Sequence, residues 1–256
     1  MTVLGKVALV VGGSHSIGRA IAEEFAVNGA RTVICSRPTS SPPDLSSLAR
    51  RGFEVRWEPA DMTDPDSMRG LVERVVENFG RLDILVASGS PTGAKADLFA
   101  DMSPLQYQRT LDAQFVAKLN CLHAALGPMR ARKYGKVIFV TSDAGRTPTP
   151  GESLVGAAAA ALMFFTRAAG RELARDGVRV NCIGTTLTKN TEVHARIEAY
   201  GEDHVLSKAF ASIEARTPFR MNVPEDIAKL ALFLGSSDSD QISGAVLSIN
   251  GGLSFP

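Results

Sequence analysis

The residues best suited to binding chemistry lie in a glycine-rich turn near the start of the chain. Gly12, Ser14, Ser16 and Gly18 lie between a short apolar run and a helical pattern. Glycine lets a backbone approach a phosphate closely, and the free N–H groups at the start of a helix bind anions. The same glycines could instead serve only the geometry of a strand-to-helix turn. The turn therefore predicts either a phosphate site or a purely structural corner.

The cysteines and histidines give no sign of a disulfide or a metal site. Cys35, Cys121 and Cys182 lie far apart in apolar surroundings, so we expect three buried free thiols. The four histidines show no ligand spacing with one another or with a cysteine. We therefore expect no metal.

The bulk composition argues against several classes of function. The 256 residues are 45% hydrophobic and 21% charged, which suits one α/β domain with a sizeable core. A net charge of +1 without a basic cluster gives no reason to expect a nucleic acid partner. The longest uncharged apolar stretch, residues 155–165, is too short to span a bilayer, and the N-terminus lacks the layout of a signal peptide. We expect a cytoplasmic protein without a membrane contact.

Short apolar runs alternate with helical stretches along the chain. Because the runs show no polar alternation, we expect parallel strands that helices bury on both faces. Residues 38–47 are rich in Pro and Ser but few, so we interpret them as a loop within one domain. Residues 185–222 break the rhythm with charged amphipathic pieces, and we expect them to form a lid over the carboxyl edge of the sheet. The expected strands cover residues 6–13, 32–36, 53–57, 82–87, 137–141, 178–183 and 245–249.

The order and spacing of several motifs resemble the short-chain dehydrogenase/reductase family along essentially the whole chain. These motifs are the glycine-rich turn, Asp61, and the stretches LDILV, GKVIFVTS, VRVN, PEDIA and SGAVLSINGG. The resemblance implies a single-domain Rossmann fold over residues 1–256, doubly wound around a seven-stranded parallel sheet. It also implies a nicotinamide dinucleotide and a dimer or tetramer.

The family's adenine-side motifs are partly present. Ser16 stands where the family's turn has its middle glycine, and its side chain obstructs the approach of a pyrophosphate. Arg37 resembles the NADP-preferring pattern, although an arginine at a strand end is more often simply solvated. Asp61 and Met62 match the pair that contacts adenine. The candidate cofactor-binding residues are Gly12, Ser14, Ser16, Ile17, Gly18, Arg37, Asp61 and Met62.

The nicotinamide-side motifs of the family are lost. Residues 87–90 are Ala-Ser-Gly-Ser in place of Asn-Asn-Ala-Gly, and Thr185-Thr186 replace Pro-Gly. Serine and threonine can form hydrogen bonds but do not reproduce the turn geometry that places the ring. We therefore expect NAD or NADP to bind weakly, or no dinucleotide to bind.

The family's catalytic Asn, Ser, Tyr and Lys fall by spacing on Gln114, Ser142, Val155 and Ala159. In the family reaction the phenol exchanges the proton and the ammonium lowers the pKa of that phenol. Valine has no proton to exchange, so Ser142 and Gln114 are interpreted as vestiges and no residue is assigned a catalytic role.

Other side chains could replace the missing acid. The lid offers Lys189, His194 and Tyr200, and Glu152 and Ser153 come just before the vacant position. Amphipathic lid helices normally carry such polar groups as solvated faces.

Two helices that build a subunit interface in the family keep their apolar character. Residues 155–165 contain no polar side chain, and the expected helix over residues 104–132 carries an apolar stripe. A helix that is apolar all round needs cover on its outer side as well. The stripe consists of Leu111, Phe115, Leu119, Leu122 and Leu126.

Three hypotheses follow. The first is a non-catalytic subunit that supports an NAD(P)-dependent hydroxyacyl dehydrogenase, paired with an active paralogue of the family in a heterodimer or heterotetramer. The chain resembles such a subunit of the two-subunit dehydrogenase that oxidises an aromatic 3-hydroxyacyl-CoA in anaerobic toluene degradation. The second is a regulatory protein that binds a dinucleotide without a reaction. The third is an active oxidoreductase with an unconventional acid.

Overall fold

A seven-stranded parallel sheet forms the centre of the molecule. The computed structural model describes residues 1–90 and 97–254, and its strands follow the order β3-β2-β1-β4-β5-β6-β7. Each strand coincides with an expected apolar run, so the doubly wound α/β fold is confirmed. The strands are β1 (Val7–Val11), β2 (Arg31–Ser36), β3 (Val55–Pro59), β4 (Ile84–Ala87), β5 (Gly135–Ser142), β6 (Val178–Thr185) and β7 (Val246–Ile249).

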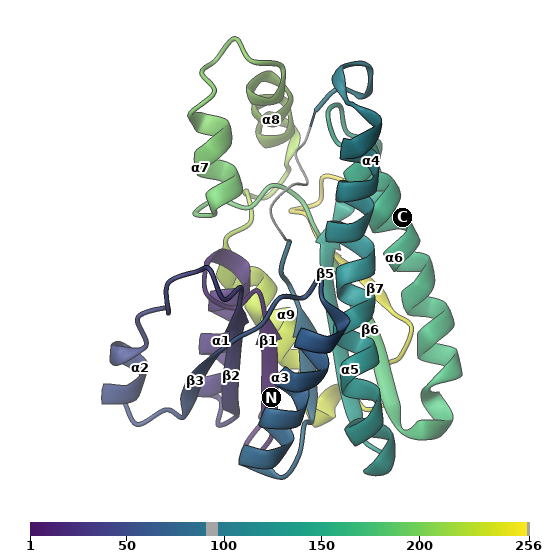
Figure 1. The fold of residues 1–256 in the computed structure, drawn as a ribbon. Helices are drawn as coiled ribbons and strands as arrows, with labels where there is room; N and C mark the ends of the chain where they lie inside the picture. The colour runs from purple at the N-terminus through teal and green to yellow at the C-terminus, as the bar shows by residue number, and fades with distance from the viewer. Residues whose placement is uncertain (91–96, 255–256) are drawn as a thin grey trace.

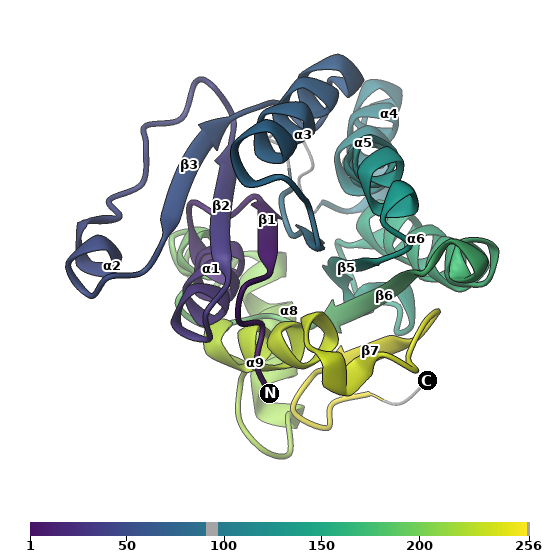
Figure 2. The same ribbon diagram turned by 90° about the horizontal axis from the view of Figure 1, so that it is seen from below.

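Helices cover both faces of this sheet (Figures 1 and 2). One face carries α1 (Ser16–Val27) and α9 (Pro224–Gly235), and the other carries α3 (Pro65–Phe79), α5 (Ala117–Ala131) and α6 (Ser153–Glu172). Because side chains alternate along a strand, each strand supplies both cores. The even-numbered residues of β1 pack under α1 and α9, and its odd-numbered residues pack under α3, α5 and α6. The shorter helices are α2 (Ser46–Arg50), η1 (Phe99–Asp101), η3 (Asp143–Gly145), η4 (Ala174–Asp176) and η5 (Ser237–Ser239).

The long helix expected over residues 104–132 contains a π-helical turn. It begins as α4 (Pro104–Leu111), widens at Asp112–Val116, and continues as α5. Such a turn inserts one extra residue and is frequent at functional sites. Gln114 lies on it, so the widening decides where the Gln114 side chain and carbonyl point.

Residues 185–222 leave the sheet at the end of β6 and return at Asn222. They contain α7 (Glu192–Glu198) and α8 (Val205–Arg216), which lie beyond the carboxyl ends of the strands (Figure 1). A β-bridge between Thr188 and Asn222 closes the base of this excursion. That these residues move as a lid stays a prediction. The excursion has a small core of its own, formed by Ile197, Leu206, Phe210, Ile213 and Met221.

Helix α6 is long and apolar enough to cross a membrane by length and composition only, a test that a core helix also passes. The helix runs for 20 residues, beyond the eleven apolar ones. Its inner side packs on β5, β6 and η3 as a layer of the fold, with Leu162 fully buried. Packing on the sheet therefore accounts for one apolar side of α6. The outer side exposes Ala157, Ala160 and Phe164.

Candidate functional site

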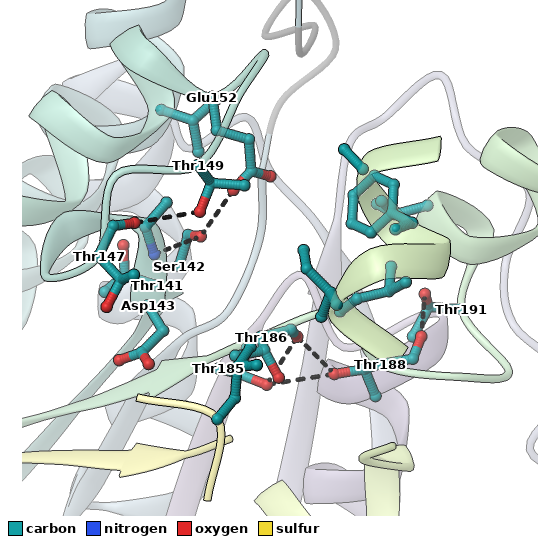
Figure 3. Close-up of a pocket in the computed structure, with 18 of the residues that line it drawn as sticks. Thr141, Ser142, Asp143, Thr147, Thr149, Glu152, Thr185, Thr186, Thr188 and Thr191 are labelled. Atoms are coloured by element: carbon teal, nitrogen blue, oxygen red, sulfur yellow. Dashed lines mark hydrogen bonds between the residues drawn. The ribbon is translucent and has the colours of Figure 1, made fainter. Parts of the chain in front are cut away.

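A cavity of about 390 Å³ lies between the carboxyl edge of the sheet and the lid region. Figure 3 shows its two sides: Ser142 and Glu152 come from the end of β5 and the start of α6, and Thr186, Thr188 and Thr191 come from the segment that leads into the lid. This volume lies within the usual range for a small-molecule pocket. Topology thus places the cavity where open α/β sheets bind ligands. On the lid side its wall includes the apolar side chains of Leu187, Val193, Phe210 and Ile213 beside polar and charged ones.

The four positions that match the family's catalytic set do not all reach this cavity. Gln114, Ser142 and Val155 line it, whereas Ala159 does not. Ala159 is 1% exposed and packs beside Gly145. The packing is so close that a Cβ added to Gly145 would lie 2.9 Å from the Ala159 Cβ. The cavity wall therefore has an isopropyl group where the resemblance implies a phenol, and the position implied for the lysine lies beneath the wall.

Ser142 and Glu152 form a polar pair in the cavity wall. The Ser142 hydroxyl donates to Glu152 Oε2 at 3.4 Å and accepts from the Ala144 N–H at 3.1 Å. Burial raises the pKa of Glu152, and the bond from Ser142 opposes this shift. A carboxyl with a raised pKa can hold a proton near neutral pH and donate it. Of the substitute acids suggested by the sequence, Glu152 is thus placed in the cavity.

Gln114 and Lys118 form a second polar pair. The Gln114 amide donates to Ser90 Oγ at 2.6 Å, and Lys118 Nζ donates to the Gln114 carbonyl at 3.2 Å. Lys118 borders the cavity, is 1% exposed, and has its pKa lowered by burial to about 8. The sequence prediction missed this lysine. The spacing could have indicated that Lys118 is buried. Lys118 lies three residues after Phe115 and four before Leu122, and is therefore on the same helix face as the apolar stripe.

The glycines of the turn are required by the fold itself. Gly12 has φ +79°, and a Cβ there would come 2.3 Å from the Gly89 Cα. A Cβ at Gly18 would come 2.0 Å from the Gly12 carbonyl oxygen. Both contacts are far closer than atoms can approach, whether or not a phosphate binds. The structural explanation of the turn is therefore sufficient for these two glycines.

Ser16 keeps the backbone shape of a glycine but adds a side chain. Its φ is +49°, in the left-handed region that disfavours residues other than glycine. The Ser16 hydroxyl accepts from the Glu192 N–H at 3.3 Å, which joins the turn to the first residue of α7. A pyrophosphate needs a bare backbone at this point. While the Ser16 hydroxyl accepts the hydrogen bond from the Glu192 N–H, the turn therefore fits the pyrophosphate of a dinucleotide poorly.

Most of the candidate cofactor-binding residues lie outside the cavity. Ile17 lines it, whereas Arg37, Asp61 and Met62 do not. The Asp61 carboxylate accepts from the backbone and hydroxyl of Thr63, at 2.9 and 2.7 Å. Ser14 shares a hydrogen bond with the neighbouring His15 ring at 2.9 Å. Of the eight candidate cofactor-binding residues, Ile17 is thus the one that lines the cavity.

The threonines that replace Pro-Gly bond to one another and to the base of the lid region. The hydroxyls of Thr185 and Thr188 lie 3.1 Å apart, and Thr188 donates to the Thr186 carbonyl at 3.0 Å (Figure 3). The Asn222 amide donates to Thr186 Oγ1 at 3.2 Å and to the Ile249 carbonyl at 2.6 Å. The Asn222 amide therefore ties the end of the excursion to both Thr186 and β7.

The three lid residues that could replace the missing acid, Lys189, His194 and Tyr200, do not line the cavity. Lys189 pairs with Glu214, and the His194 ring lies 3.3 Å from the Glu198 carboxylate. Tyr200 stacks on His204 and is 43% exposed. The ion pairs and the ring stacking of Lys189, His194 and Tyr200 are ordinary surface contacts and indicate no catalytic role.

All three cysteines are buried free thiols, as expected. Burial raises the pKa of the Cys35 thiol to about 12. Across residues 1–90 and 97–254, no group of three or more His, Cys, Asp or Glu side chains is arranged to hold a metal ion.

Comparison with known proteins gives matches over nearly the whole chain. A family model described as enoyl-(acyl carrier protein) reductase matches residues 11–254. The 3-oxoacyl-[acyl-carrier-protein] reductase FabG of Haemophilus influenzae is 31% identical over 251 residues, which are 97% of this chain and 98% of that protein. Oxidoreductase UcpA of Escherichia coli K12 is 32% identical over 257 residues, 98% of this chain and 95% of that protein. The crystal structure of a dehydrogenase/reductase from Sinorhizobium meliloti 1021 matches with a TM-score of 0.84 at 26% identity, covering 98% of this chain and 96% of that chain.

Proposed function

Since this chain belongs to the short-chain dehydrogenase/reductase family, we propose that it acts as a non-catalytic subunit, which assembles with a catalytically intact member of the same family. Its relatives include named oxidoreductases. The observation that carries the proposal is the cavity wall, where Val155 replaces the phenol that would exchange a proton with the substrate.

The loss at Val155 has a large expected effect on rate. General acid–base catalysis contributes about 10²- to 10⁴-fold to a typical enzymatic rate. The buried methyl of Ala159 also leaves out the cation that lowers the pKa of the phenol in relatives. On this proposal the chain keeps the shape of the site without the phenol and the ammonium of the family's catalytic set.

The outer face of α6 supports the assembly part of the proposal. Phe164 is 71% exposed and lies in line with the exposed Ala157 and Ala160, at helical spacings of three and four residues. Small residues beside one large ring let a second helix approach closely. An exposed apolar stripe of this kind is typical of an interface rather than of a solvated surface.

The ligands of the assembly follow from the same proposal. We expect this chain to bind NAD or NADP weakly or not at all. We expect it to complete the site of a partner that acts on a hydroxyacyl group, for example one carried as a CoA thioester. The name of the Haemophilus relative, a 3-oxoacyl-[acyl-carrier-protein] reductase, favours an acyl substrate. We place the assembly, a heterodimer or heterotetramer, in the cytoplasm.

A second candidate function rests on Glu152. Its contact with Ser142 and its raised pKa would let Glu152 donate a proton to a carbonyl oxygen held by Ser142. In that case the chain would be an active oxidoreductase with an unconventional acid.

Co-expression with family members that carry Tyr-x-x-x-Lys tests the subunit role. We expect one of them to co-purify with this chain as a heteromer, with a molar mass by light scattering that matches two or four subunits. Phe164→Glu should abolish the heteromer, because it places a charge in the apolar face. Leu4→Glu is the matched control, since Leu4 is 77% exposed and precedes β1. A homo-oligomer with full dehydrogenase activity, or a heteromer that Phe164→Glu leaves intact, would contradict the proposal.

A further inference from the structure

Lys118 is a buried cation at the inner side of the cavity. It lies in the first turn of α5, is 1% exposed, and borders the cavity together with Gln114 and Ser142. Its ammonium donates one hydrogen bond, to the Gln114 carbonyl at 3.2 Å. Two of the three N–H groups therefore have no acceptor among residues 1–90 and 97–254.

No carboxylate of the described chain compensates this charge. The titratable groups that act on Lys118 are the thiols of Cys121 and Cys182. Burial raises the pKa of both thiols, that of Cys182 to about 12, so both are neutral at pH 7. A buried cation without a counter-ion is costly to keep, and proteins usually pair or neutralise it.

The other charged groups around the cavity are engaged elsewhere or lie at its exposed side. Its described lining includes two carboxyls, Asp143 and Glu152. The Asp143 oxygens accept from Ser248, Asn250 and Ser254, and Glu152 Oε2 accepts from the Ser142 hydroxyl, so neither carboxyl contacts Lys118. Arg196 and Arg216 border the cavity from the exposed surfaces of α7 and α8.

The opposite wall of the cavity carries an apolar patch. Val193, Phe210 and Ile213 line it from the lid region, which faces Ser142 and Glu152 across the cavity in Figure 3. A ligand that satisfies both walls needs an anionic end for Lys118 and an apolar body for the lid region.

We propose that this cavity binds a small carboxylic acid with an apolar body, and that the carboxylate accepts hydrogen bonds from the Lys118 ammonium. The proposal goes beyond the subunit role, because it requires neither a partner chain nor a dinucleotide. It explains why an uncompensated cation is kept at this depth. The carboxylate supplies the missing charge and the missing acceptors.

Calorimetric titration of the purified full chain tests this with 3-phenylpropanoate and its neutral amide, 3-phenylpropanamide. We expect the acid to bind measurably at pH 7 and the amide to bind at least about tenfold more weakly, since bonds to a charged group are the stronger ones. Lys118→Met should weaken binding of the acid by about tenfold or more and leave the amide unchanged. Lys208→Met, on an exposed lid lysine, is the matched control and should change neither.

The pH dependence separates a binding role from a structural one. As the pH rises above 8, Lys118 loses its proton, so affinity for the acid should fall in the wild type and stay flat in Lys118→Met. The thiols of Cys121 and Cys182 titrate too high to cause this change. The proposal is overturned if the acid does not bind, if acid and amide bind alike, or if Lys118→Met binds the acid as the wild type does. None of these outcomes bears on co-purification with a partner, so the two proposals fail separately.

Discussion

The two ends of the sheet each bury a lysine, and they treat it differently. At the amino end of β5, Lys136 is 1% exposed, and its ammonium contacts Asp240 at 2.8 Å, the Ser236 carbonyl at 3.0 Å and Ser239 Oγ at 2.9 Å. At the carboxyl end, Lys118 is also 1% exposed, and within the described part of the chain its ammonium has a single backbone carbonyl, that of Gln114, as partner. The amino end therefore satisfies its charge within the fold. At the cavity end, the fold supplies no counter-ion for the Lys118 ammonium within the described residues, so a bound ligand can supply it.

The same contrast holds for residues without charge. Gly12 and Gly18 are held in place by backbone contacts that no side chain tolerates, whereas nothing in the fold requires a phenol at Val155. A motif made of glycines can therefore persist after its ligand is lost. A motif made of reactive side chains has no such support from the packing of the fold.

The largest effect should come from the turn. Gly18→Ala should lower the free energy of unfolding by more than about 3 kcal/mol, because the new Cβ would come 2.0 Å from the Gly12 carbonyl oxygen. Gly127→Ala, in α5, meets nothing within 4 Å and should instead stabilise by about 0.5–1 kcal/mol. Urea denaturation of both variants checks the pair. A mild effect of Gly18→Ala would show that the turn is not fixed by its own packing.

Lys136→Met should have the next largest effect on the free energy of unfolding. It removes three contacts and leaves the Asp240 carboxylate without its lysine, so we expect a loss of about 1–3 kcal/mol. Urea denaturation at pH 7 measures it. A neutral result would remove the distinction between the two ends of the sheet.

Lys118→Met should act in the opposite direction and stabilise the free chain at pH 7 by about 1–2 kcal/mol. Burial lowers the folded pKa of Lys118 from 10.5 to about 8. The unfolded chain therefore binds more protons between these two pH values, and wild-type stability rises with pH through this window. The advantage of the variant should be complete below pH 8 and vanish near 10.5, as thermal unfolding across this range would show. A destabilised variant would mean that Lys118 is structural.

Asp240→Asn should give the smallest effect. Contact with the Lys136 ammonium lowers the pKa of Asp240, so its stabilisation is present above the unfolded pKa and is lost as the pH falls through the folded pKa. Because Asp240 is 42% exposed, we expect about 1 kcal/mol at pH 7, and a difference from the wild type that narrows below about pH 4. Unfolding curves at pH 7 and pH 3 provide the test.

The sequence predicted the fold better than the site. All seven strands could be found because parallel strands are continuous apolar runs, and Val155 and Ala159 could be placed by spacing alone. The π-helical turn around Gln114 has no such signal, because it depends on packing between α4 and α6. Lys118 was hidden for a related reason. A lysine in an apolar stripe usually extends to solvent, and its burial depends on the cavity beside it.

Turnover by the isolated chain tests the central claim most directly. The purified protein, assayed for reduction of NAD or NADP over a panel of hydroxyacyl thioesters, should give no rate above the background without protein. Addition of the intact partner should give turnover that depends on the heteromer. Turnover by the chain alone, lost in Glu152→Gln and retained in the matched Glu192→Gln, would contradict the subunit role and establish Glu152 as the acid.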